Sequence, residues 1–225
     1  MANLLIASLF FIFIHLFISG TALRKILLNM MGGTAFKAAF ALLSLIGVVW
    51  MSVAYGRAPH MELWGDLPAI KPVTAFAMFI AFLFVVAGVS TASPTAIGGE
   101  MLLTGEEPAR GILRVTRHPV MWGTSLWGLV HLMANGDGAS LIFFGSLLFL
   151  SLMGPLLIDR KRMKLSKRRW DRFAAKTSSF PFIAILQKRN RLKLKEIGLG
   201  RFVGGMVVFS LFLYFHAMLF GVPAI

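Results

Sequence analysis

Long apolar runs separated by short polar segments dominate the chain. A helix that crosses a bilayer needs roughly 20 mostly apolar residues, and several runs approach that length. Apolar residues fill these runs without the alternation that marks a half-buried strand, so helices are predicted. We expect an all-α, polytopic integral membrane protein with about six spans, which cover residues 3–23, 35–55, 73–90, 119–133, 139–158 and 202–221.

Two of the predicted spans need comment. The first has no basic residue before it and is longer than the apolar core of a signal peptide, so we interpret it as a retained span. The fourth is the shortest, but Pro119 stands at its first turn, a position that proline favours in helices. Both runs are therefore counted as spans.

Composition agrees with this pattern. Hydrophobic residues make up 57% of the chain and charged residues only 14%, with a mean hydropathy of +0.78. A soluble domain has a smaller apolar and a larger charged share. No segment outside the apolar runs is long enough for a soluble module, so one membrane domain covering residues 1–225 is predicted.

Positive charge is distributed unevenly around the predicted spans. Every Lys and Arg except Arg57 and Lys71 lies in or beside the segments that follow spans one, three and five. Such residues accumulate on the cytoplasmic side of membrane proteins. The pattern predicts a bacterial inner (cytoplasmic) membrane protein with both termini periplasmic and a basic cytoplasmic loop at 159–201.

The net charge of +14 raises the question of nucleic acid, because the segment DRKRMKLSKRRWDRF mixes basic and aromatic residues. A loop held between two spans, with Trp170 and Phe173 on a basic background, is better interpreted as an amphipathic segment on anionic headgroups. Membrane lipid is therefore the expected partner, and nucleic acid is not.

Cysteine is absent, which excludes disulfides, thiolate catalysis, iron–sulfur clusters and covalent haem attachment. No Asp or Glu lies inside a predicted span, so a carboxylate pair at the bilayer midplane is not expected. Any metal would need His, Met or oxygen ligands.

Histidine is the ionisable residue that remains within the spans, as His15, His131 and His216. An ionisable residue inside a membrane is a functional hypothesis by default. Helix rise from the nearest basic boundary residue puts these three at depths of roughly 14, 21 and 22 Å. Imidazoles in an apolar cavity without a thiolate suit non-covalent haem. The alternative is that each one simply hydrogen-bonds a neighbouring helix.

The block GILRVTRHPVMWGTSLWGLVH, with HLFISGTALR before it and DRKRMKLSKRRWDRFAAKTSSFPF after it, resembles the NnrU family. It is also similar to the related 15-cis-zeta-carotene isomerases of plants and cyanobacteria. The resemblance implies a multi-spanning protein that binds haem b through two histidines. By position in the motifs, these ligands are His15 and His131. His216, near the outer end of the last predicted span, is the rival ligand.

The resemblance also implies a function. In the isomerases, reduced haem is thought to lose an axial ligand and to act on a central cis double bond of a membrane-dissolved polyene. His15 and His131 would then be catalytic as well as metal-ligating, and reduction would require a redox partner. NnrU proteins are associated with nitrite and nitric oxide metabolism in denitrifying bacteria. The substrate is therefore a hydrophobic small molecule or nitric oxide.

The residues Arg114, Arg117, His118 and Pro119 admit a second class of function. They also resemble membrane methyltransferases that bind S-adenosylmethionine and modify isoprenylcysteine or phospholipid amines. Under the haem hypothesis, Arg114, Arg117 and His118 would instead hold haem propionates or an anionic headgroup. His118 and His131 are separated by about 220° around an ideal helix, so we expect them to serve different sites.

The same helix carries Gly123, which shares a face with His131. A glycine on a membrane helix lets a flat group or a neighbouring helix approach closely. We therefore expect a close contact at Gly123.

Overall fold

In the computed structural model, described for residues 1–18, 21, 23–65, 67–104, 107 and 109–224, the chain is helical. The α-helices are α1 (Ala2–Phe13), α2 (Leu23–Gly56), α3 (Lys71–Val89), α4 (Pro119–Asn135), α5 (Gly138–Leu165), α6 (Lys167–Lys176), α7 (Ile183–Leu186), α8 (Leu194–Ile197) and α9 (Leu199–Phe220). A π-helix, η1 (Ile14–Ile18), extends α1, and 3₁₀ segments form η2 (Pro68–Ile70), η3 (Gly99–Thr104) and η4 (Gly111–Arg114).

Membrane-spanning length is reached by four of the described helices, namely α2, α3, α5 and α9. The predicted all-α membrane protein is confirmed to that extent, but six spans are not. The first run forms the apolar helix 2–18, and residues 19, 20 and 22 of the predicted span lie outside the described part. The fourth run forms α4, which has 17 residues and ends before a turn at Gly136, where φ is +61°.

The segment predicted as a basic loop, 159–201, contains regular structure. Helix α5 continues through Asp159 to Leu165, and α6, α7 and α8 follow. Helix α2 also begins earlier than the predicted span, at Leu23, and it is interrupted at Gly32, where φ is +80°. Glycine reaches positive φ without the steric penalty of a side chain, so the break falls on a residue that permits it.

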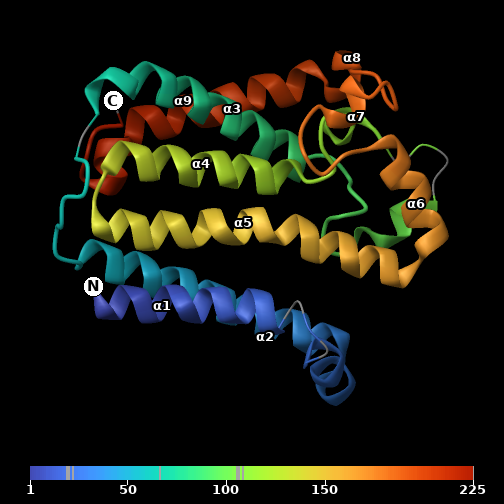
Figure 1. Ribbon diagram of the computed structural model, residues 1–225, viewed down its shortest axis with the longest axis horizontal. Helices are drawn as coiled ribbons and strands as arrows, with labels where there is room; N and C mark the ends of the chain where they lie inside the picture. The colour runs from blue at the N-terminus through green and yellow to red at the C-terminus, as the bar shows by residue number, and fades with distance from the viewer. Residues whose placement is uncertain (19–20, 22, 66, 105–106, 108, 225) are drawn as a thin grey trace. The chain divides into compact units, whose positions relative to one another are not determined.

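Two compact units make up the chain: unit 1 holds residues 1–68 and 128–150, and unit 2 holds residues 69–127 and 151–225. In unit 1, α1 lies beside α2 in the opposite direction (Figure 1). Near the start of α1, Asn3 accepts a hydrogen bond from the Trp50 indole (3.1 Å), and near its end Phe11 packs on Gly47. A Cβ at Gly47 would lie 2.9 Å from the Phe11 ring, so the glycine permits this approach.

In unit 2, α3 lies along α9 (Figure 1). Their contact uses edge-to-face aromatic pairs such as Phe79 with Phe209, 5.6 Å between centroids, a favourable ring geometry. Helix α4 approaches α3 at Gly123, where a Cβ would lie 2.8 Å from the Ala81 carbonyl oxygen. Of the two neighbours that Gly123 was expected to admit, a flat group or a helix, the structure shows a helix.

Candidate functional site

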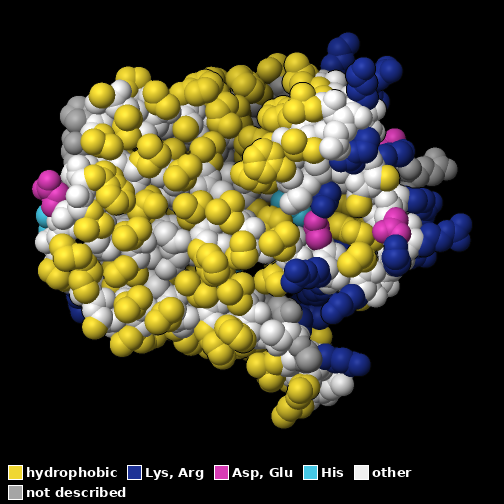
Figure 2. Space-filling view, in the orientation of Figure 1, with side chains coloured by type: hydrophobic (Ala, Val, Ile, Leu, Met, Phe, Trp, Pro, Cys, Tyr) yellow, Lys and Arg dark blue, Asp and Glu magenta, His cyan; other side chains and the backbone are white. Residues whose placement is uncertain are grey.

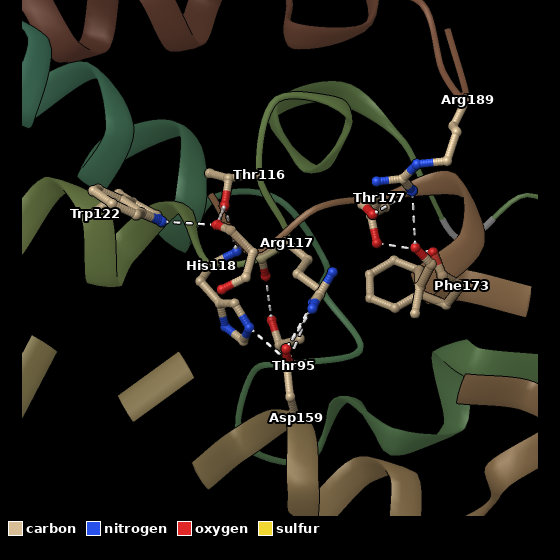
Figure 3. Close-up of polar contacts among 11 residues, drawn as sticks. Thr95, Thr116, Arg117, His118, Trp122, Asp159, Phe173, Thr177 and Arg189 are labelled. Carbon is tan, nitrogen blue, oxygen red and sulfur yellow. Dashed lines mark hydrogen bonds and ion pairs between the residues drawn. The ribbon is translucent and has the colours of Figure 1, made fainter. Parts of the chain in front are cut away.

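The motif Arg117-His118-Pro119 lies directly before and at the start of α4 in unit 2. Arg117 donates from Nε and Nη2 to the Asp159 carboxylate on α5, at 3.0 and 2.5 Å to Oδ2. His118 Nε2 lies 2.7 Å from Asp159 Oδ1 (Figure 3). One carboxylate therefore holds both motif side chains, and a buried pair of this kind needs such hydrogen bonds to offset its desolvation.

The backbone around this cluster is fixed from the chain that follows α6. The Arg117 N–H donates to the Ser178 carbonyl (3.0 Å), and the Thr116 hydroxyl donates to the Ser179 carbonyl (2.6 Å). The Trp122 indole donates to the same Ser179 oxygen (2.8 Å). The donors Thr116 and Trp122 are labelled in Figure 3. These bonds satisfy polar groups in a buried region, where an unmade hydrogen bond is costly.

Helix α6 also meets the cluster through an aromatic ring. The Arg117 guanidinium carbon lies 5.4 Å from the centre of the Trp170 ring, within cation–π range. Trp170 and Phe173 are 4% and 0% exposed and pack with Leu103. The apolar side of α6 is therefore covered by the protein itself.

Arg114 forms a second buried cluster. Its guanidinium donates to both carboxylate oxygens of Glu196, at 2.7 and 3.0 Å, and to the Asn190 amide oxygen at 2.9 Å. The Gly111 N–H donates to Glu196 as well (3.1 Å). The bond from Arg114 lowers the pKa of Glu196 to about 2, further helped by the Gly111 and Lys193 bonds.

The three motif side chains are thus turned inward. Arg114 and His118 are 7% and 3% exposed, and each is bonded to a carboxylate. Burial lowers the pKa of His118, with the Asp159 hydrogen bond opposing that effect in part. A neutral imidazole that donates Nε2–H to Asp159 satisfies both groups. A role of Arg114, Arg117 and His118 in holding propionates or headgroups stays a prediction, and it would require them to exchange these partners.

His15 lies in the π-helical turn η1, a kind of helix distortion that is frequent at functional sites. Its Nδ1 donates to the Phe11 carbonyl at 2.8 Å, and its ring contacts Phe11 and Phe40 at 4.3 and 5.2 Å between centroids. A histidine whose Nδ1–H is bound to a carbonyl presents Nε2 as an acceptor, which is the usual arrangement of a metal-ligating histidine.

His131 lies in α4, in unit 1 as His15 does. Its ring stacks on Phe144, with centroids 4.8 Å apart, and Phe144 meets the edge of Tyr55 at 5.7 Å. The Tyr55 hydroxyl is 2.9 Å from the Ser140 hydroxyl, which donates to Asp137 at 2.5 Å. A hydrogen-bonded chain that starts at the α4–α5 turn therefore anchors the aromatic group against which His131 lies.

The contacts of the two histidines fall at different levels of α2. His15 meets Phe40, whereas the aromatic group beside His131 meets Tyr55. Fifteen residues of helix rise about 22 Å. Each imidazole suits a haem ligand by itself, and ligation of one iron atom by the pair stays a prediction. No group of three or more metal-ligating side chains occurs within the described ranges.

The rival ligand His216 lies in α9 of unit 2. Its Nδ1 is 2.7 Å from the Val222 carbonyl, and its ring contacts Phe220 at 4.8 Å.

Sequence reasoning missed Glu196 and Asn190 as partners of Arg114. They are polar residues in a strongly basic segment, and no local motif links them to a residue some 80 positions earlier.

Comparison with known proteins bears on nearly the whole chain. Residues 3–224 match the model of the family described as NnrU protein. The chain is 27% identical to the chloroplastic 15-cis-zeta-carotene isomerase of Zea mays and 28% identical to that of Arabidopsis thaliana. Each alignment covers 84% of this chain and 52% of the relative, so the chain spans about half the length of these relatives. No solved structure is significantly similar. The chain belongs to the NnrU family.

Proposed function

We propose that this protein is a membrane-embedded isomerase that converts a cis double bond of a long polyene, such as a 15-cis-zeta-carotene-like molecule, to trans. The observation that carries the proposal is the similarity to two 15-cis-zeta-carotene isomerases over 84% of the chain. Four helices of membrane-spanning length and apolar character give such a substrate access from the bilayer. These relatives favour a polyene over nitric oxide and an isomerase over a methyltransferase.

The cofactor that we propose is haem b, with His131 as its first ligand and His15 as the second. Haem iron would supply a coordination centre whose ligand affinity changes with its oxidation state. The donor chemistry of His15 supports this proposal, since its Nδ1 is bonded to Phe11. We assign no step of the isomerisation to the cofactor.

The placement in the membrane is part of the proposal. We place the Lys- and Arg-rich segments on the cytoplasmic side of a bacterial inner membrane and both termini in the periplasm. Asymmetric positive charge supports this orientation.

Activity tests the function directly. The protein is produced in bacteria that accumulate 15-cis-zeta-carotene, and the carotenoids are separated by chromatography. We expect the trans product with the unaltered chain, loss of product with His131→Ala, and no loss with His60→Ala, which alters an exposed histidine. Absence of product from a stably folded, membrane-inserted protein would refute the isomerase proposal.

Absorption spectra of the detergent-purified protein, oxidised and reduced, test the cofactor separately. A Soret band that His131→Ala abolishes and His118→Ala retains would support haem at His131, since His118 is bonded to Asp159. The effect of His15→Ala decides whether the second ligand is His15. A protein made with ample haem that lacks this band would refute the haem proposal.

A further inference from the structure

Helix α6 separates its basic and apolar residues onto two faces, and the apolar face is covered by other residues of unit 2. Trp170 and Phe173 are buried with Leu103. Apolar side chains that are already covered by protein contribute nothing to insertion into lipid. The exposed face of α6 must therefore be explained by its charge.

That face is strongly positive. Its exposed basic side chains are Lys167, Arg168, Arg169, Arg172 and Lys176, and Lys164 near the end of α5 is exposed as well. Lys167 pairs with Asp171 at 2.6 Å, and Lys176 lies 3.4 Å from Glu107. Within the part of the chain that the structure describes, the other four make no ion pair. Figure 2 shows Lys and Arg side chains gathered where Figure 1 places α6.

The basic face is preformed. Arg189 donates from Nη1 to the Ala174, Ala175 and Thr177 carbonyls at 3.2, 2.7 and 2.9 Å, which caps the C-terminus of α6. Thr177 donates in turn to the Phe173 carbonyl at 2.8 Å (Figure 3). A surface whose backbone is already fixed loses little conformational freedom when it binds a ligand.

The position of α6 directly after α5 indicates which partner its basic face meets. Helix α5 has membrane-spanning length, and only Ser166 separates it from α6. Exposed apolar side chains precede and follow α6 in the sequence, with Leu165 60% and Phe180 59% exposed. Basic groups beside apolar ones, at the end of a span, match the boundary between acyl chains and headgroups.

We infer that the basic face of α6 binds the phosphate groups of anionic phospholipids at the membrane surface. Basic residues near an anionic leaflet are attracted by its negative surface potential. Helix insertion plays no part, since the apolar face stays on the protein core. This inference does not depend on the isomerase proposal, because it concerns the lipid around the protein and not the substrate.

Lipid selectivity of the full chain in proteoliposomes tests the inference. Spin-labelled phosphatidylglycerol and spin-labelled phosphatidylcholine are compared by the fraction that the protein immobilises. We expect the anionic label to be preferred by the unaltered chain, and the triple change Arg168→Glu, Arg169→Glu, Arg172→Glu to abolish that preference. High salt should also abolish it, because the Debye length falls to about 3 Å at 1 M.

The matched control reverses three other exposed charges, in the segment that follows α6, through the changes Lys188→Glu, Arg191→Glu and Lys195→Glu. We expect this variant to keep most of the preference, and both variants to keep the thermal stability of the parent. An α6 variant that is stable and still prefers phosphatidylglycerol would overturn the inference. Equal losses in both variants would also overturn it, because net charge alone would then explain the preference.

Discussion

Arg117 and Asp159 form an ion pair in which two guanidinium nitrogens donate to one carboxylate oxygen, at 3.0 and 2.5 Å. The pair joins the segment before α4 to the C-terminal part of α5. Both side chains are largely buried, at 14% and 17% exposure. Asp159 also holds His118, and Trp170 covers Arg117. Removing the carboxylate charge would leave a buried guanidinium without its counter-ion.

Asp159→Asn should therefore destabilise the protein by about 3 kcal/mol, the lower part of the range for breaking a buried pair. Thermal unfolding in detergent, followed by circular dichroism, measures the change. The control is Asp171→Asn, which removes the exposed pair with Lys167 and should cost about 0.5 kcal/mol or less. Equal effects of the two changes would show that the Asp159 cluster adds nothing to stability.

Acid should weaken the contact between Arg114 and Glu196. The pKa of Glu196 falls from 4.5 to about 2 in the folded protein. The pair therefore stabilises the fold above pH 4.5, and that stabilisation is lost as the pH falls from 4.5 toward 2. Glu196→Gln should be less stable than the parent at neutral pH, with the difference shrinking in acid and in high salt. Melting temperatures of both proteins across this range provide the measurement.

The sequence predicted what depends on local pattern. Apolar run length predicted the positions of α2, α3, α5 and α9, because a bilayer imposes that length on a span. It also predicted that a neighbour approaches Gly123 closely, and the structure shows that this neighbour is helix α3. Six spans are not confirmed, because α4, which is limited by Pro119 and by the turn at Gly136, has 17 residues.

Features that depend on distant pairing were not predictable. The spacing of Trp170 and Phe173 indicates one apolar helix face, but spacing does not tell whether lipid or protein covers it. The depths of His15 and His131 were measured from different basic residues, which assumed a common membrane boundary. The contact of His15 with Phe40 instead relates its position to helix α2.

Tyr55→Phe should reveal the contribution of the hydrogen-bonded chain beside His131. The change removes the hydroxyl that meets Ser140 and keeps the ring that packs on Phe143 and Phe144. The expected loss is about 1 kcal/mol, the usual net contribution of one hydrogen bond. Tyr214→Phe, at an 80% exposed position, is the control and should be neutral. Thermal unfolding measures both, and equal stabilities would contradict the assigned role of Tyr55.

Gly123→Ala should test the close contact between α4 and α3. A Cβ at this position would lie 2.8 Å from the Ala81 carbonyl oxygen and 3.1 Å from the Val85 nitrogen, and backbone atoms cannot rotate away as a side chain can. The helices must then separate, at an expected cost of about 1–3 kcal/mol.

Gly145→Ala is the matched control, because no atom lies within 4 Å of its added Cβ. Alanine is the better helix former by up to about 1 kcal/mol, so the control should be neutral or stabilising. Opposite shifts of the melting temperature are expected, and a Gly123→Ala protein as stable as the Gly145→Ala protein would show that α4 is not held against α3 at this glycine.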